Sequence, residues 1–381
     1  MYLFEGEEHA ALRAQVRRFA REHIAPHAPE WEEAEEFPVG LYRVAAEAGM
    51  IGIGYPSEVG GGGGDVTHVL VASDEMLLAG RSVGTAVGLG SHGIAIPPIL
   101  RFGTDEQKRR FAVPVVAGAK IAALAITEPG GGSDVASLST RAERRGDEYV
   151  VNGAKTFITS GCRADIVTTA VRTGGAGHGG VSVLVIERGT PGFEVSRKLK
   201  KTGWWASDTA ELSFQDCRVP AGNLIGGENA GFPILMANFV PERLMLAGQC
   251  VAISELAYRE SVAYARERRA FGRTLGGFQV IRHKLADMAT RIAAARALTG
   301  EVAVRAARGE LNAASLAAMA KNAASDACSW VVDQAVQIHG GYGYMREVLV
   351  ERLFRDARLY PIGGGTREIM NEIIAKTEGY G

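Results

Sequence analysis

The spacing of apolar residues changes twice along this chain, and this change limits the folds open to it. Up to about residue 120 the spacing is helical, as in EEHAALRAQVRRFAREHI, where Leu12, Val16 and Phe19 share one face. The period then falls to two, and it returns to helical spacing near residue 230. This order predicts an α+β protein with an N-terminal helical domain (1–120), a middle β domain (121–229) and a C-terminal helical domain (230–381).

The middle region contains short runs rich in Val, Ile, Thr and Phe, including KIAALAIT, DEYVVNGAKTFITSG, ADIVTTAVRT, GVSVLVIER and TAELSFQDCRV. Gly, Asn and Asp separate these runs, and we expect turns there, for example at Asn152-Gly153. The pattern predicts a compact antiparallel β domain.

The last region carries long apolar stripes at helical spacing. One stripe contains Ile281, Leu285, Met288 and Ile292, and a second contains Leu316, Met319, Ala323, Ala327 and Trp330. Long amphipathic helices with short links predict a helical bundle.

Composition excludes several classes of protein. With 42 Lys and Arg against 43 Asp and Glu, nothing indicates a nucleic-acid partner. The four cysteines form no CxxC pair, so neither a disulfide framework nor a zinc knuckle is expected. The N-terminus lacks a secretory signal and no stretch reaches membrane-spanning length, so we expect a soluble cytoplasmic protein that binds no membrane.

Two short motifs match only by letter. GAGHGG, Gly175 to Gly180, fits GxGxxG, but a strand follows it where a dinucleotide site needs a helix N-terminus. His23 and His27 have ligand-like spacing, yet Pro26 intervenes and no third ligand is near. We therefore expect no metal site.

Glycine-rich loops mark the candidate site. ITEPGGGSD ends a strand with hydroxyls and free backbone N–H groups, which suits a flat heteroaromatic ring or a thioester. NGAKTFITSG places Phe157 and Thr159 two residues apart on one strand, as an aromatic wall and a hydroxyl beside a ring. The triplet Gly363 to Gly365 precedes a helix that Thr366 can cap, and it allows a close approach of the backbone.

Taken with FGRTLGGFQ, QIHGGYGYMRE and ERLFRDARL, these motifs make the chain resemble the acyl-CoA dehydrogenase family of flavoproteins over nearly its whole length. It is most similar to the isovaleryl-CoA and long-chain acyl-CoA dehydrogenase branch. The resemblance implies a middle β-barrel, a C-terminal four-helix bundle and FAD between them. It also implies a homo-oligomer, expected to be a tetramer, in which a neighbouring subunit contributes to each flavin site.

The resemblance assigns residues by position. Those expected near FAD are Leu124, Ile126, Thr127, Ser133, Phe157, Thr159, Arg268, Phe271, Gln279, Gln337, Gly340, Gly341, Thr366 and Glu368. Among these, Arg268 is the natural pyrophosphate partner across a subunit interface. Those expected near the substrate are Ser133, Phe239, Arg243 and Gly365. For each, packing or capping is the alternative role.

The family's chemistry needs a base for the proton next to the thioester carbonyl. Many relatives carry a glutamate at the position of Gly364, and glycine cannot take a proton. Either the chain has no dehydrogenase activity, or a carboxylate at another position in the sequence is the base. Glu242 matches the position of the base in the isovaleryl-CoA and long-chain branch. Pro241 should disturb the helix there and free the Ala237 carbonyl, although an ion pair with Arg243 is the alternative fate of Glu242.

The environment of Glu242 favours the role of base. Phe239, Met245 and Leu246 are apolar, and burial among them would raise the carboxyl pKa. In the family, the main chain at the position of Gly364 stabilises the enolate oxygen, so the loop keeps that role without a carboxylate. The glycines would also leave space for an acyl substituent or for the repositioned carboxylate.

The resemblance implies dehydrogenation of an acyl-CoA to a trans-2-enoyl-CoA, with hydride transfer to flavin N5 and an electron-transfer flavoprotein as acceptor. Two alternatives remain: a flavin oxidase or monooxygenase on the same fold, and a non-catalytic DNA-binding relative. Acyl length and branching depend on how VGLGSHGIAIPPIL packs against the helix after Gly231. The position of the base favours long or branched acyl groups by analogy.

Overall fold

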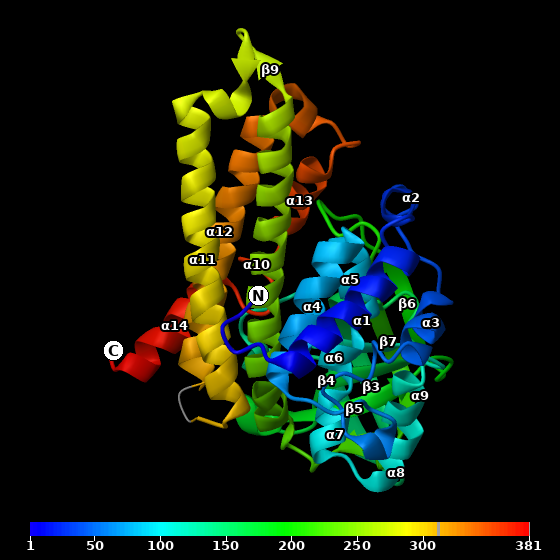
Figure 1. Cartoon of the computed structure of the whole chain (residues 1–381). Coiled ribbons are helices and arrows are strands. Elements are labelled where there is room, and N and C mark those ends of the chain that lie inside the picture. The colour runs from blue at the N-terminus through cyan, green and yellow to red at the C-terminus, as the bar shows by residue number, and fades with distance from the viewer. Residues whose placement is uncertain (311–312, 381) are drawn as a thin grey trace.

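The computed structural model describes residues 1–310 and 313–380, and its regions follow the order that the sequence predicts. Short helices and a β-sheet lie together, and long helices extend past them to a free end (Figure 1). The helical parts and the middle sheet belong to one fold because three buried apolar clusters link them.

The N-terminal region is helical, as predicted. Its helices are α1 (Glu7–His23), α2 (Ala28–Glu33), α3 (Leu41–Glu47), α4 (Val66–Gly80), α5 (Val83–Leu89), α6 (His92–Ala95), α7 (Pro97–Phe102), α8 (Asp105–Gln107) and α9 (Val113–Val116). The apolar face of α1 is buried at Val16 and Phe19. The glycine run at 60–64 connects to α4, which Asp65 caps by accepting the Thr67 N–H at 2.8 Å.

The middle region is one sheet. Its strands are β1 (Ala122–Ala125), β2 (Arg141–Arg145), β3 (Glu148–Thr159), β4 (Ile166–Arg172), β5 (Val181–Glu187), β6 (Phe193–Lys198), β7 (Thr209–Pro220) and β8 (Leu224–Ile225). They pair in the order β6-β7-β3-β2-β4-β5-β8, with β1 also beside β4.

The sheet is mixed, which corrects the expectation of a purely antiparallel domain. Both β1 and β2 pair with β4 in parallel, while the other strand pairs of this sheet are antiparallel. Among the described residues no strand pair joins β6 to β8, so a closed barrel stays a prediction.

The expected turn at Asn152-Gly153 is wrong. Both residues lie inside β3, where the register with β7 shifts between Val151 and Gly153. Gly153 has φ 149°, and a Cβ there would lie 2.6 Å from Thr140 Oγ1. The glycine therefore permits a bulge and a close backbone approach within a continuous strand.

The C-terminal region is a bundle. Its elements are α10 (Gly231–Glu267), β9 (Arg269–Ala270), β10 (Arg273–Thr274), α11 (Gln279–Ala307), α12 (Ala313–His339), α13 (Leu349–Ala357) and α14 (Arg367–Glu378). The first predicted stripe faces the core, where Met288 and Ile292 are buried. The second is wrong in part, because Ala323 is exposed and the buried face of α12 instead carries Ala317, Ala320, Ala324, Ala327, Cys328 and Val331. Three helices are long, and the shorter α14 lies against α12. The β9–β10 hairpin forms the free tip of the bundle (Figure 1).

In the described part of the chain, no single helix has the length and apolar character to cross a bilayer. The bent helix pair Val83–Leu89 and His92–Phe102 is, by length and composition alone, long and apolar enough to cross one.

A buried pair of acids joins the three regions. The Trp204 N–H, in the loop after β6, donates to Asp356 Oδ1 of α13 at 2.6 Å. Ala206 N donates to Glu32 Oε1 of α2 at 3.5 Å. Burial raises the pKa of Asp356 to about 7, and the neighbouring Glu32 charge acts in the same direction. The loop between β6 and β7 is thus held by one acid from each helical region.

Asp356→Asn tests this joint. The unfolded Asp356 loses its proton near pH 4 and the folded one near pH 7, so wild-type stability from this group falls as pH rises through that window. Asparagine still accepts the Trp204 N–H but does not titrate, so it does not cause this loss of stability. The free energy of unfolding of the variant, relative to that of wild type, should therefore rise by roughly 3 kcal/mol between pH 4 and pH 8. Urea unfolding at both pH values measures this.

Asp326→Asn is the matched control, because Asp326 is an exposed acid paired with Arg367. It should leave the pH dependence of wild type in place. An unchanged pH dependence in Asp356→Asn would contradict the buried-acid account.

Candidate active site

The start of α10 carries the candidate base, and an arginine supports it from the N-terminal region. α10 continues through Pro241, whose missing N–H leaves the Ala237 carbonyl free of its helical partner, as predicted. Arg101 Nη1 of α7 donates to that carbonyl at 3.0 Å. The next residue, Asn238, donates from Nδ2 to the Ile94 carbonyl at 3.0 Å. The segment Ile94–Arg101 is thus fixed against this part of α10.

The carboxylate of Glu242 is enclosed and unpartnered. The residue as a whole is half-buried, but its Oε2 atom is shielded from solvent and has no hydrogen-bond partner. No ion pair with Arg243 forms within the described residues. Burial raises the pKa of Glu242 to about 7, while Arg243 and Lys321 act to lower it. A carboxyl with this pKa can exchange a proton near neutral pH.

The glycine triplet lies directly beside this carboxylate. Gly364 and Gly365 have φ values of 65° and 96°, a backbone region that favours glycine. A Cβ on Gly364 would lie 2.3 Å from Leu246 Cδ1 and 3.5 Å from Glu242 Oε1. The chain therefore brings Gly364 and Glu242 together, and Leu246 and the carboxylate occupy the space that a side chain at position 364 would need.

Two cations hold the carbonyl groups of this loop. Arg243 Nε donates to the Gly364 carbonyl at 3.4 Å. Lys321 Nζ donates to the Gly365 carbonyl at 2.7 Å and to the Tyr360 carbonyl at 2.9 Å. In the described part of the chain, the N–H groups of Gly364 and Gly365 have no acceptor. The loop thus offers two free backbone donors next to the carboxylate.

Lys321 was missed by the sequence analysis. It is fully buried on the face of α12 that also carries Ala317 and Ala324. A lysine within a stripe of small apolar residues was the signal that would have found it, because lysine is rarely buried without a role.

The expected substrate residues lie around this point, with one exception. Arg243 stacks over the Phe239 ring at 5.3 Å, and Gly365 lies within reach of its guanidinium, since a Cβ there would be 3.9 Å from Nη2. Ser133 is instead exposed in the glycine loop after β1. The structure brings Phe239, Arg243 and Gly365 together with Glu242, and Ser133 belongs to the sheet side.

On the sheet side, β1 and β3 present the expected flavin residues. Leu124 and Ile126 are half-buried against the core, and the Thr127 carbonyl accepts the Thr156 N–H at 2.9 Å. Phe157 is 68% exposed with φ 61°, next to a register shift in β3. Thr159 is half-buried. The bulge directs an aromatic ring outward from a strand whose neighbours are buried.

A buried ion pair supports this loop. Lys155 Nζ donates to Glu128 Oε1 at 2.8 Å and to the Ile126 carbonyl at 2.9 Å. Burial alone would raise the pKa of Glu128, but Lys155 and the donors Ser139 and Thr140 lower it to about 2. Glu128 lies in the ITEPGGGSD motif and Lys155 in NGAKTFITSG, but the sequence predicted a role for neither.

Six further expected flavin residues lie at the tip of the bundle. Arg268 precedes the β9–β10 hairpin, Phe271 lies in its turn and Gln279 begins α11. Gln337 lies in the last turn of α12, and Gly340 and Gly341 follow that helix; all six residues are exposed. The Arg268 guanidinium lies 5.8 Å from the Tyr342 ring, so these segments are neighbours. Figure 1 shows the hairpin far along the bundle from the sheet. A single chain therefore does not bring the sheet-side and tip residues together.

The last two expected flavin residues begin α14. Thr366 caps this helix, accepting the Ile369 N–H at 3.3 Å, and Glu368 is exposed. Capping, the alternative role, is therefore observed for Thr366.

The residues present fit a flat heteroaromatic cofactor. Phe157 and Phe271 expose their rings, although both are large apolar residues. Cβ atoms on Gly130, Gly131 and Gly340 would meet nothing within 4 Å, so the backbone there borders open space. Stacking surfaces, hydroxyls and an exposed arginine form a donor set suited to FAD, provided that two copies of the chain supply the two halves.

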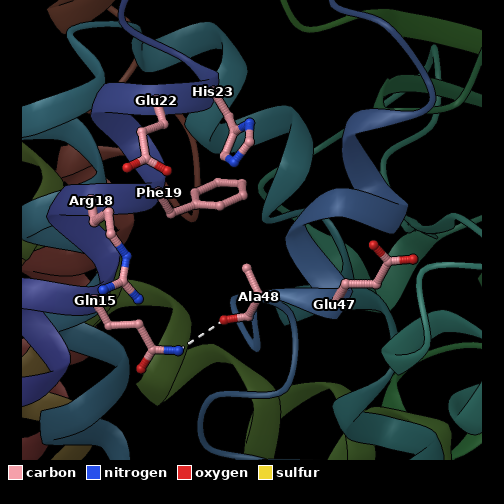
Figure 2. A pocket seen from close by; sticks show the side chains of 7 residues that line it. All are labelled: Gln15, Arg18, Phe19, Glu22, His23, Glu47 and Ala48. Atoms are coloured by element: carbon pink, nitrogen blue, oxygen red, sulfur yellow. Dashed lines mark hydrogen bonds between the residues drawn. The ribbon is translucent and has the colours of Figure 1, made fainter.

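A surface pocket elsewhere has no part in this site. It lies between α1 and α3 and is lined by Gln15, Arg18, Phe19, Glu22, His23, Glu47 and Ala48 (Figure 2). Gln15 Nε2 crosses it to the Ala48 carbonyl at 2.9 Å (Figure 2). None of the expected site residues lines it.

Comparison with known proteins covers nearly the whole chain. Family models match residues 6–119 ("Acyl-CoA dehydrogenase, N-terminal domain"), 123–217 ("middle domain") and 229–378 ("C-terminal domain"). An acyl-CoA dehydrogenase of Bacillus subtilis is 42% identical over 97% of both chains. The mitochondrial long-chain specific acyl-CoA dehydrogenase of Rattus norvegicus is 39% identical over 97% of this chain and 86% of that protein.

A solved structure agrees with these sequence matches. The crystal structure of a probable acyl-CoA dehydrogenase from Mycobacterium abscessus superposes with a TM-score of 0.97 at 53% identity. It covers 98% of this chain and 99% of its own.

Gly364→Ala tests the packing at the glycine loop. A Cβ at this position meets Leu246 at 2.3 Å and the backbone has φ 65°, so we expect a loss of about 2–4 kcal/mol in the free energy of unfolding. Gly363→Ala is the control, because its Cβ would meet Leu359 at an ordinary 3.6 Å. Equal urea midpoints for the two variants would contradict this packing.

Proposed function

We propose, since this chain belongs to the acyl-CoA dehydrogenase family, that Glu242 removes the α-proton of an acyl-CoA thioester, which becomes a trans-2-enoyl-CoA. The chain is an oxidoreductase that acts on acyl-CoA, and its family depends on FAD. The observation that carries the assignment of the base is the Glu242 carboxylate, whose Oε2 atom is shielded from solvent and has no hydrogen-bond partner among the described residues.

The proton step follows from the state of Glu242. A carboxylate stripped of water and of donors is a stronger base than one in solution, and its pKa of about 7 leaves it partly ionised at neutral pH. Leu246 and the Gly364 backbone lie beside it. The residue is therefore suited to take a weakly acidic carbon-bound proton.

Charge that develops on the thioester oxygen needs donors. The unpaired N–H groups of Gly364 and Gly365 supply them without a side chain, and Arg243 and Lys321 hold the loop carbonyls away. FAD, when bound, supplies the acceptor for the hydride that leaves the β-carbon. The exposed face of Phe157 and the Ile126–Thr127 backbone would hold its ring system.

The flavin site is proposed to need a second copy of the chain. Support comes from the separation of the sheet-side residues from Arg268, Phe271 and Gln279 at the bundle tip (Figure 1). A homotetramer in the cytoplasm, with an electron-transfer flavoprotein as acceptor, completes the proposal. Long or branched acyl groups fit the proposed branch of the family, with Ile94–Arg101 and the start of α10 as walls of the acyl site.

Glu242→Gln tests the base. The variant keeps the shape of the side chain and loses the proton acceptor, so the rate of flavin reduction by acyl-CoA should fall by about 10³-fold or more. Anaerobic mixing with isovaleryl-, octanoyl- and palmitoyl-CoA, followed by flavin absorbance, measures this and identifies the substrate class. In wild type the rate should rise with pH up to about 7, as Glu242 ionises.

Glu255→Gln is the matched control, because Glu255 lies on the same helix and pairs with Arg259 and Arg296. It should change the rate only a few-fold. Reduction by Glu242→Gln at the wild-type rate would remove Glu242 from the mechanism. Rapid reoxidation by air with product bound would identify an oxidase instead of a dehydrogenase.

A mixed oligomer tests the second copy. Glu242→Gln and Arg268→Ala chains, each inactive alone, are expressed together. If Arg268 serves the neighbouring site, a mixed dimer contains one intact site, and random pairing should restore about a quarter of wild-type activity. No recovery in isolated mixed oligomers would show that Arg268 acts within its own chain.

A further inference from the structure

Lys321 is a buried cation whose place in the fold has no packing explanation. Its side chain is 0% exposed, yet in the described part of the chain no carboxylate pairs with it. Its hydrogen bonds go to two backbone carbonyls, those of Tyr360 and Gly365. An ammonium without an anionic partner is costly to bury, so a role beyond core packing is required.

The Lys321 side chain and the Glu242 carboxylate both lie beside Gly364. A Cβ on Gly364 would be 3.5 Å from Glu242 Oε1 and 3.7 Å from Lys321 Cε. No hydrogen bond or salt bridge joins the two side chains, so each acts on the other through space. In an enclosed site with few water molecules, a charge at this range acts more strongly than it would in solvent.

The other titratable groups near this pair are few. From α10, Arg243 and Cys250 act on it, and from the segment after α13, Tyr360 directs its hydroxyl to Gln249 at 3.1 Å. Burial lowers the pKa of Lys321 to about 8; Arg243 lowers it too, while Cys250 and Glu242 raise it. Lys321 therefore remains mostly charged at pH 7, the range in which the base must be ionised.

We propose that Lys321 is a positioning residue of the active site: it orients the Gly363–Gly365 loop through the carbonyls of Tyr360 and Gly365, and its charge favours the ionised form of Glu242. This rests on the proposed role of Glu242 as base. Lys321 occupies the Tyr360 and Gly365 carbonyls, and in the described part of the chain the N–H groups of Gly364 and Gly365 have no acceptor. One side chain thus fixes the position of the loop N–H donors and also favours the ionised form of Glu242.

The test is the titration of Glu242 by infrared difference spectroscopy of the holoenzyme. The carbonyl stretch of a protonated carboxyl that is missing in Glu242→Gln identifies the residue without any turnover. Lys321→Met and Lys321→Gln remove the charge, and the second keeps N–H donors for the carbonyls. In both, the titration midpoint of Glu242 should move up by about one unit. The pH profile of flavin reduction should move with it, with a roughly five-fold lower rate at pH 7.

Asn322→Ala is the matched control. Asn322 is the next residue of α12 and also links this helix to α14, through Asn371 Oδ1 at 2.9 Å and the Arg367 carbonyl at 3.4 Å. It carries no charge, so its loss should leave the Glu242 midpoint and the pH profile where they are. Lys321→Arg, which keeps the charge, should restore the wild-type midpoint.

The outcomes separate the two proposals. An unmoved Glu242 midpoint in Lys321→Gln, or an equal movement in Asn322→Ala, would overturn the role of Lys321 while the base assignment stood. Full activity of Glu242→Gln would remove the base assignment instead. Collapse of both neutral variants would show that Lys321 serves folding, and would overturn the proposal as well.

Discussion

The isolation of one carboxylate from water and from hydrogen-bond donors is the constraint on which this site depends. Glu242 is held among Leu246 and the Gly364 backbone, with Oε2 unsatisfied, and such burial is unfavourable for the charged form. The fold accommodates it by placing cations nearby without letting them pair with it. A direct ion pair would stabilise the carboxylate and make it a poorer base.

Placing a base on α10 has consequences for the rest of the chain. Pro241 frees the Ala237 carbonyl beside it, and Arg101 satisfies that group from the N-terminal region. Position 364 favours glycine because its φ is 65° and because Leu246 Cδ1 lies where a Cβ would stand. The N-terminal helices, the start of α10 and the loop before α14 therefore meet around Glu242, and on the sheet side Lys155 and Glu128 support the loop after β1.

The sequence predicted the three regions because hydrophobic period is a local property that short windows reveal. The meeting of Glu242 with Gly364 came from resemblance, since no spacing rule joins residues so far apart. The sequence did not predict roles for Lys321 and Lys155, because their partners include backbone carbonyls, and no sequence pattern identifies such partners. Asn152-Gly153 was read as a turn because the dipeptide favours one locally, whereas the approach of Thr140 that requires Gly153 is a tertiary feature.

The most direct measurement of the central claim is α-hydrogen exchange in D₂O, using an acyl-CoA analogue whose β-carbon is replaced by sulfur so that no hydride can leave. Proton abstraction is then observed alone, by mass spectrometry of the analogue. The account predicts rapid exchange with wild type and none above background with Glu242→Gln. Equal exchange with both would show that another group takes the proton, and that the buried carboxylate of Glu242 has a different purpose.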